Sequence, residues 1–206
     1  MKTKTVLVAS QKGGSGKTTI VAHLSVESER SDKAKSFLVD TDPQASLSTW
    51  HRRREKDTPA RIDVTISRIG EAIDKLEASG ADFVFIDSAP TISEHTATLI
   101  ALSDFIIVPV RPSPTDLWSV GQTIELIKKA GKPFLFVLNQ AKMNATITAQ
   151  AVEALRKHGP VAPTIITDRV VYASSMVGGL TAQEVERGAA SVEIADLWFD
   201  VRGCMI

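Results

Sequence analysis

The sequence predicts an α/β fold in which helices cover both faces of a doubly wound, mostly parallel sheet. Short apolar segments alternate with helix-length segments, the apolar segments are nearly continuous runs of Val, Ile, Leu and Phe, and a glycine-rich loop follows the first of them. Continuous apolar runs suit strands buried on both faces, and the alternation is typical of βαβ units. With 206 residues, 43% of them hydrophobic, we expect a single domain over 1–206.

Each element is assigned from its length and apolar content. The expected strands are 5–9, 36–39, 83–86, 105–110 and 134–138, with a weaker one at 164–166. The expected helices are 17–29, 69–78, 93–102, 117–129, 146–157 and 190–199. Open α/β sheets bind ligands at the carboxyl ends of their strands, so functional residues are expected there.

The strongest local motif lies between the first strand and the first helix. Residues 12–19 read Lys-Gly-Gly-Ser-Gly-Lys-Thr-Thr, which indicates a phosphate-binding loop. Its glycines let the backbone wrap around an anion, and the helix N-terminus adds positive potential. Lys17 can reach the β- and γ-phosphates and the Thr18 hydroxyl can ligate Mg²⁺. The expected nucleotide-binding residues of the loop are Gly13, Gly14, Ser15, Gly16, Lys17, Thr18 and Thr19.

Acidic residues end two of the expected strands. Asp40 and Asp42 follow the second strand in the order Asp-Thr-Asp-Pro-Gln, and Asp87 ends the strand 83–86. Aspartate often ends a strand merely because it caps the next turn or helix. Beside a phosphate-binding loop, however, a carboxylate delivered by an apolar strand holds Mg²⁺ directly or through water, and Asp87 is the candidate.

The loop departs from the general phosphate-binding pattern in a way that resembles one family. Gln11 stands where the first glycine should be, and a second lysine, Lys12, precedes the double glycine. This arrangement, with the motif that begins at Asp40, resembles the ParA/MinD family of deviant Walker A ATPases. Within it the chain is most similar to the short ParA-type class, which has no N-terminal helix-turn-helix. A lysine seen alone would more often be a solvated loop charge.

The resemblance implies roles for individual residues. Lys12 would act as the signature lysine, reaching across a dimer interface to the partner's nucleotide, and Asp42 would position and help activate the attacking water. Lys12, Lys17 and Asp42 together form the expected catalytic set. Asp40 would support its loop and the metal's water shell, so the expected metal site comprises Thr18, Asp40 and Asp87. Asn139 would contact adenine, since an amide can both donate and accept, which favours ATP over GTP; a turn residue is the alternative.

The function implied by the resemblance is an ATPase switch that partitions plasmid or chromosomal DNA. An ATP-bound, Mg²⁺-dependent homodimer would bind nonspecific DNA, and a centromere-binding adaptor of the ParB or ParG type would stimulate slow hydrolysis. The protein would be cytoplasmic and nucleoid-associated, without stable membrane association. Lysine plus arginine equals aspartate plus glutamate at 24 each, so any DNA-binding patch must be local. Candidate contributors are His51, Arg52, Arg53, Arg54, Lys128, Lys129, Arg156, Lys157, His158, Arg187 and Arg202.

Several other functions remain or are excluded. A MinD-like regulator or another cargo-positioning ATPase is the main alternative, although acidic Glu193, Asp196 and Asp200 in the last helix would repel anionic lipid. A small-molecule P-loop synthetase of the dethiobiotin type is a weaker one. The lone Cys204 argues against a disulfide framework and against an iron–sulfur cluster, which needs several thiolates. No stretch approaches a membrane span of roughly 18 apolar residues, and no signal-peptide core follows the N-terminus.

Overall fold

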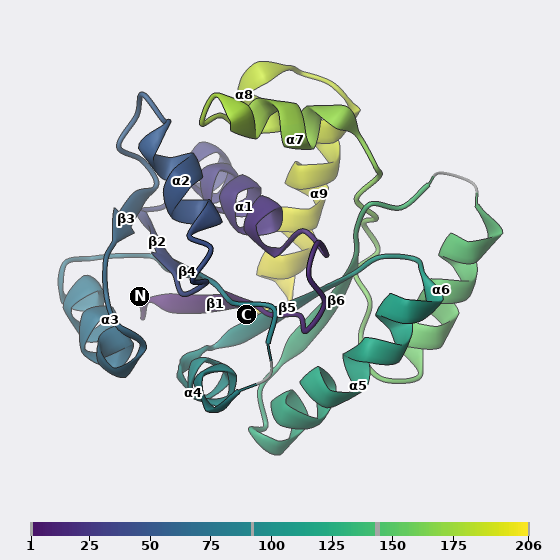
Figure 1. The fold of residues 1–206 in the computed structure, drawn as a ribbon. Coiled ribbons are helices and arrows are strands. Elements are labelled where there is room, and N and C mark those ends of the chain that lie inside the picture. The colour runs from purple at the N-terminus through teal and green to yellow at the C-terminus, as the bar shows by residue number, and fades with distance from the viewer. Residues whose placement is uncertain (1, 92, 143–144, 206) are drawn as a thin grey trace.

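The computed structural model describes residues 2–91, 93–142 and 145–205, and its centre is a six-stranded, fully parallel sheet. The strands lie in the order β3-β2-β4-β1-β5-β6, so the chain passes from β1 to β2 and β3, returns to β4 between β2 and β1, and then continues to β5 and β6 on the other side of β1 (Figure 1). Their bounds are β1 Lys4–Val8, β2 Ser36–Asp40, β3 Ala60–Ile62, β4 Phe83–Asp87, β5 Phe105–Val110 and β6 Phe134–Leu138. The predicted doubly wound α/β class is confirmed.

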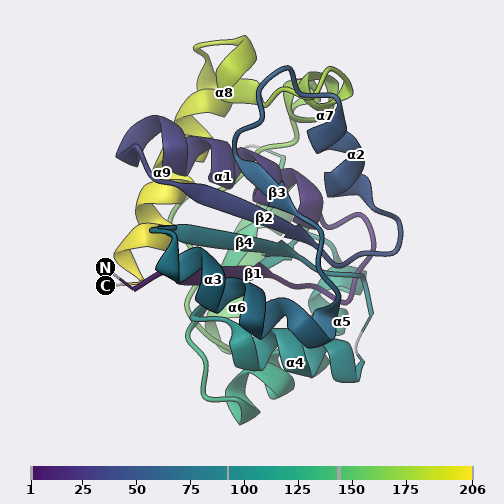
Figure 2. The same cartoon turned by 90° about the vertical axis from the view of Figure 1, so that its left-hand side faces the viewer.

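Helices form a layer on each face of the sheet (Figure 2). One layer contains α1 Lys17–Asp32, α2 Ser46–Arg52, α7 Val170–Val177, α8 Ala182–Val185 and α9 Ala189–Gly203. The other contains η1 Ile66–Arg68, α3 Ile69–Ala78, α4 Glu94–Leu102, α5 Pro114–Lys129 and α6 Thr146–Arg156. Within the described ranges, no helix combines the length and the apolar composition that crossing a bilayer requires.

The alternation of side chains along each strand creates two cores. Val6 and Val8 of β1 point into one core, with α1 and α9, and Leu7 points into the other, with α4 and α5. Both faces are thus apolar, which is why the strands read as continuous hydrophobic runs. In the first core Trp198 of α9 packs on Phe83 at 5.0 Å between ring centroids.

The shorter elements were not predicted from the sequence. β3 has three residues, all half-buried, at the outer edge of the sheet, and it carries no apolar run long enough to be recognised. α2, α7 and α8 have seven, eight and four residues, too few for a helical period to be read. The weaker strand expected at 164–166 was wrong: this segment lies beside β6, with isolated bridges at Val161 and Thr167 instead of a continuous ladder.

Candidate functional site

The glycine-rich loop turns tightly from β1 into α1. Gly14 and Gly16 have φ values of 74° and 90°, a backbone region that favours glycine. Gly16 also lacks room for a side chain, because a Cβ there would lie 2.1 Å from Asn139 Nδ2. Gly16 is the residue before α1, so the first amide groups of that helix point toward the loop. The loop therefore has the backbone shape that a phosphate cradle requires.

The end of β6 braces this loop. Asn139 Nδ2 donates to the carbonyl oxygen of Ser15 at 2.7 Å, and Gln140 Nε2 donates to that of Gly14 at 3.1 Å. Asn139 is 4% exposed, whereas Gln140 is exposed and lines the cavity above the loop. The adenine contact expected of Asn139 stays a prediction, and Gln140 is a neighbour that the sequence reasoning left out although it follows the same strand end.

Lys17 and Lys12 face different spaces. Lys17 is 7% exposed and lines the same cavity as the glycines, and its Nζ donates to Lys12 O at 3.4 Å. Burial lowers the pKa of Lys17, and the nearby carboxylates of Asp87 and Asp42 partly oppose that shift. Lys12 is half-buried and lines a separate hollow of about 550 Å³ beside α5, which also contains Trp118. The two lysines are thus suited to different tasks.

Asp87 and Thr18 lie together beneath the loop. Thr18 Oγ1 donates to Asp87 Oδ2 at 2.6 Å, and Asp87 is fully buried. Burial raises the pKa of Asp87 to about 7, although the Thr18 hydrogen bond lowers it. Its other oxygen, Oδ1, has no hydrogen-bond partner among the residues that the structure describes. A buried carboxylate oxygen without a donor, next to a hydroxyl, suits a hard cation that prefers oxygen ligands.

A magnesium site here would need ligands from outside the protein. In the described part of the chain, no group of three His, Cys, Asp or Glu side chains could hold a metal ion. Mg²⁺ usually takes one or two protein ligands and completes its octahedron with phosphate oxygens and water. Thr18 and Asp87 fit that pattern.

The loop after β2, residues 40–44, is called the switch loop below. Both oxygens of Asp40 accept hydrogen bonds: Oδ1 from Asp42 N within the loop at 3.1 Å, and Oδ2 from N and Oγ of Ser48 in α2 at 2.8 Å each. Asp40 therefore supports the loop, and its part in a metal's water shell stays a prediction. Asp42 Oδ1 accepts from Gln44 N at 2.9 Å, and Asp42 lines the cavity with Lys17.

The cavity above the glycine-rich loop has a volume of about 790 Å³, within the usual range for ligand sites. The glycine-rich loop, except Ser15, and the start of α1 form its floor over residues 13–19. Asp42, Pro90 and Gln140 lie at its sides. Its outer walls come from two helices that the sequence did not reveal, α2 (Ser46, Thr49, Trp50, with Arg53 beyond its end) and α7 (Ala173, Met176, Val177). The predicted residues Lys17, Thr18 and Asp42 are brought together here.

Arg111 is a further residue that the sequence reasoning missed. It follows β5, and Asp116 holds it through bonds from Nε at 2.9 Å and from Nη2 at 3.0 Å. Its Nη1 lies 3.6 Å from where a Cβ on Gly14 would stand. The rule that functional residues follow strand ends could have found it.

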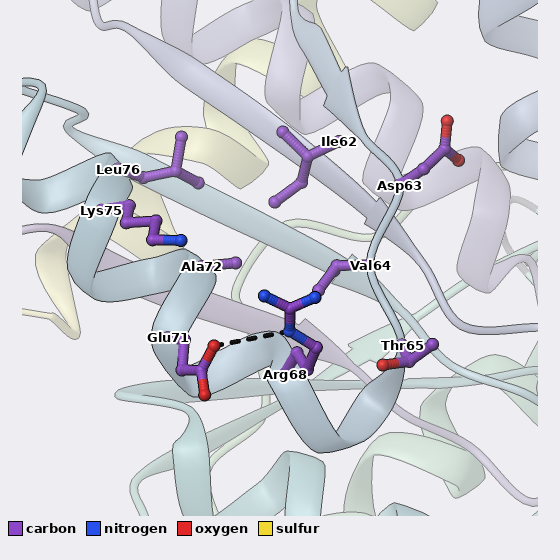
Figure 3. A pocket seen from close by; sticks show the side chains of 9 residues that line it. All are labelled: Ile62, Asp63, Val64, Thr65, Arg68, Glu71, Ala72, Lys75 and Leu76. Carbon is purple, nitrogen blue, oxygen red and sulfur yellow. Dashed lines mark hydrogen bonds and ion pairs between the residues drawn. The ribbon is translucent and has the colours of Figure 1, made fainter.

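A second hollow, of about 440 Å³, lies at the open edge of the sheet between β3 and α3 (Figure 3). Ile62, Val64 and Leu76 form its apolar part, and the Arg68 guanidinium extends between Val64 and Ala72. Arg68 also pairs with Glu71 at 3.4 Å. The predicted site residues lie elsewhere.

The basic run 51–54 is divided in the structure, because Arg52 and Arg53 are exposed whereas His51 is half-buried and the Arg54 side chain is buried. The Arg54 side chain is 3% exposed and pairs with Glu184 at 2.9 Å, so its inclusion among the DNA-binding candidates was wrong. His51 Nε2 lies 2.9 Å from Pro59 O. Arg202 pairs with Asp32 at 2.6 Å and Arg156 with Glu153 at 3.1 Å. Lys128, Lys129, Lys157 and His158 are exposed near the ends of α5 and α6.

Comparison with known proteins shows the family of this chain. The profile of the CobQ/CobB/MinD/ParA nucleotide binding domain matches residues 6–180. The chain is 35% identical over 204 residues to the "Maintenance of carboxysome distribution protein A" of Halothiobacillus neapolitanus, covering 95% of this chain and 93% of that protein. It is 29% identical over 155 residues to "Protein ParA" of Rhizobium radiobacter, covering 74% and 67%.

The fold is similar to that of solved relatives. The structure titled "Structure of Cyanthece apo McdA" superimposes with a TM-score of 0.81 at 17% identity, covering 99% of this chain and 100% of that one. That likeness concerns the fold alone. The family profile spans the glycine-rich loop, the switch loop and Asp87, whose arrangement can bind a nucleotide. The chain therefore belongs to the CobQ/CobB/MinD/ParA family and is a nucleotide-binding ATPase of the ParA/MinD type.

Proposed function

We propose that this protein is an ATP-dependent, dimerising switch that positions a large intracellular assembly. The observation that carries the proposal is the 35% identity, over nearly the whole of both chains, to a protein named for the maintenance of carboxysome distribution. Partition of plasmid or chromosomal DNA, the function expected from the sequence, is the second candidate and is favoured by the similarity to a ParA protein. The two candidates share one chemical cycle and differ in the cargo.

The proposed chemistry begins with nucleotide binding. The backbone amides of residues 13–19 and the Lys17 ammonium would hold the phosphates of ATP in the 790 Å³ cavity. Thr18 and Asp87 would hold Mg²⁺, which supplies charge neutralisation of the β- and γ-phosphate oxygens when bound. Asp42, at the side of the same cavity, would orient the attacking water. Without further charge stabilisation the turnover should be slow.

A second copy of the chain is the proposed source of the remaining charge. Lys12 lines the hollow beside α5 and not the cavity of its own nucleotide, which suits a lysine that reaches a partner's phosphates. Trp118, 79% exposed, lies in that hollow and would be covered by the partner. An adaptor protein bound to the cargo, of the ParB or ParG type if the cargo is DNA, would stimulate hydrolysis.

Nonspecific DNA is the proposed track for the ATP-bound dimer. The chain has no net charge, so binding would depend on local cations such as Lys128, Lys129 and Lys157, and should weaken as salt is raised. The protein would then be cytoplasmic and nucleoid-associated, with no stable membrane association.

Sedimentation of the purified protein tests the switch. Wild type, Lys12→Ala and Lys75→Ala are each compared with ATP and Mg²⁺, with ADP and Mg²⁺, and with or without a nonspecific duplex. Lys75 is exposed on α3, away from the proposed interface, and is the matched control. We expect an ATP-dependent dimer that binds DNA in wild type and Lys75→Ala, and its loss in Lys12→Ala. A wild-type chain that stays monomeric in every nucleotide state would contradict the switch and favour a small-molecule synthetase.

Deletion of the gene in its own host would separate the two cargo classes. Protein assemblies are imaged in the deletion strain, and inheritance of plasmids and chromosomes is measured in parallel. Mislocalised protein assemblies with normal plasmid and chromosome inheritance after deletion would support the positioning function. Loss of plasmids or chromosomes with correctly spaced assemblies would support DNA partition instead.

A further inference from the structure

The helix α2 continues the switch loop directly. Ala45 N donates to Asp42 O at 2.8 Å, and Ser48 N in the first turn of α2 donates to Asp40 at 2.8 Å. Ala45, the residue before α2, has a φ of 50°, which sharply redirects the chain at this junction. A movement of α2 would therefore move Asp42 with it.

The far end of α2 is bound to the turn between α7 and α8, which lies beside it in both views (Figures 1 and 2). Three side chains from this end donate to carbonyl groups at the end of α7 and in the turn that follows it. The bonds run from Arg53 to Val177 O at 3.1 Å, from Arg54 to Gly179 O at 2.8 Å and from Trp50 to Leu180 O at 3.0 Å. Val177 is the last residue of α7, and the last carbonyls of a helix lack partners within it, so the Arg53 guanidinium both satisfies one of them and interacts favourably with the helix dipole.

Arg54 is the centre of this contact. Its guanidinium makes two bonds to Glu184, at 2.9 and 3.0 Å, and lies 4.7 Å from the Trp50 ring centroid. Glu184 in turn accepts from Thr181 N at 3.0 Å and Thr181 Oγ1 at 2.9 Å, which caps α8. Because Arg54 is buried, its removal would leave charged and polar groups without partners.

Gly179 allows the two backbones to approach closely. It has a φ of 73°, and a Cβ there would lie 2.4 Å from the backbone carbon of Arg53. Such a distance is shorter than any normal contact, so a side chain would force the turn away from α2. Residues 50, 53, 54 and 177–184 are called the clamp below.

The clamp joins the two outer walls of the nucleotide cavity. α2 contributes Thr49 and Trp50 to that cavity, and α7 contributes Ala173 and Met176. α8 is also bound to α1, the helix that follows the glycine-rich loop, because Ala182 N donates to His23 Nε2 at 3.0 Å. The separation of the walls thus depends on the clamp, whose central ion pair, Arg54 with Glu184, lies outside the lining of the cavity.

We propose that Arg54 is a positioning residue of the nucleotide site: by holding α2 against the α7–α8 turn, it sets the width of the cavity and the place of Asp42 above the glycine-rich loop. This inference rests on the proposed function, since it assumes that ATP occupies the cavity. Arg54 is not among the residues that line the cavity, so its loss should act through helix positions.

Two variants open the clamp by independent means. Arg54→Met removes the charge, with Lys56→Met, an exposed cation in the following loop, as its control. Gly179→Ala introduces the clash, with Gly80→Ala as its control, because Gly80 has a similar φ of 78° and no described atom within 4 Å of a new Cβ. Arg54→Lys tests partial rescue. For each, calorimetry gives the Kd for ADP–Mg²⁺ and ATP–Mg²⁺ well below the melting temperature, and steady-state assays give kcat and KM.

We expect Arg54→Met and Gly179→Ala each to weaken nucleotide binding about tenfold and to lower kcat severalfold, with Arg54→Lys between them and wild type. Both controls should match wild type. If the two variants melt earlier yet keep wild-type Kd and kcat, the clamp is merely structural and the proposal is wrong. If Arg54→Met does not fold, Gly179→Ala and Arg54→Lys decide the question by the same criteria. A wild-type protein that binds neither nucleotide would instead overturn the proposed function.

Discussion

His23 is fully buried in α1, and both of its ring nitrogens are engaged. Nε2 accepts from Ala182 N at 3.0 Å, so Nδ1 carries the proton and donates to Thr19 O at 2.8 Å. A second proton on Nε2 would break the bond to α8. Burial accordingly lowers the pKa of His23 from 6.5 to about 4, although Thr19 O and Glu184 favour the charged form.

This shift predicts a loss of stability in acid. Between pH 6.5 and about 4 the unfolded chain binds a proton at His23 that the folded protein does not, so the free energy of unfolding falls as the pH falls. The full difference is about 3 kcal/mol, and about 2 kcal/mol of it should be lost by about pH 5. Urea unfolding of wild type and His23→Gln across this range measures it. Parallel pH profiles for the two proteins would contradict the prediction, since other titrating groups are common to both.

Gly16 is the second residue with a sharp expectation. In Gly16→Ala the new Cβ would clash with Asn139 Nδ2 at 2.1 Å, and the φ of 90° would strain any side chain. The loop must shift, so we expect nucleotide affinity to fall by more than about tenfold. Calorimetry with ADP–Mg²⁺ measures this. Gly131→Ala is the control, since it has a φ of 63° and meets no described atom within 4 Å. Equal affinities for the two variants would show that the loop tolerates the methyl group.

Among the elements, α5 shows how local signals specify a helix and how one residue weakens it. Ser113 caps it by accepting from Asp116 N at 3.2 Å, Pro114 occupies the first turn, and Lys128 and Lys129 lie in the last. Gly121, in the middle, is exposed. Glycine there costs helix stability because the unfolded chain gains conformational freedom.

We therefore expect Gly121→Ala to raise the free energy of unfolding by about 0.5 to 1 kcal/mol. The new Cβ meets no described atom within 4 Å, so nothing in the folded monomer opposes the gain. The urea midpoint of the nucleotide-free protein measures it, and a lower midpoint would contradict it. Because Gly121 lines the Lys12 hollow, a more stable monomer with weaker ATP-dependent dimerisation would also locate the partner at this helix.

At the scale of the whole molecule, bound nucleotide should stabilise the fold. A ligand at 100 times its Kd adds about 2.7 kcal/mol, which for a domain of this size raises Tm by about 5 to 10 °C. Thermal unfolding with ADP, with and without Mg²⁺, measures the effect. In Asp87→Asn the Mg²⁺-dependent part should disappear while the part due to nucleotide alone remains. Asp74→Asn, at an exposed acid on α3, should keep both. An intact Mg²⁺ effect in Asp87→Asn would remove Asp87 from the metal site.

The strands and long helices were predictable because their signals are local. β5, β6 and α3 have the predicted bounds, since each is an uninterrupted apolar or amphipathic segment between turn residues. β3, α2 and α8 were not predictable, because segments of three to seven residues show no period and are stabilised by what they pack against. The expected strand at 164–166 failed for the opposite reason: its residues favour a strand, yet they form only isolated bridges next to β6.

The sequence by itself determined the class of fold, the family and the floor of the site. The glycines, the lysine and the threonines of the loop are recognisable because they are contiguous in residues 13–19. The aspartates are recognisable because they follow strands, and parallel strands bring their carboxyl ends to one edge of the sheet. Tertiary structure alone decided what surrounds that floor. Asn139 meets Ser15 across 124 residues and Arg54 meets Glu184 across 130, and contacts at such separations depend on how the layers pack. The same packing buried Arg54, which the sequence had presented as a surface cation, because an ion pair with Glu184 offsets the cost of removing it from water.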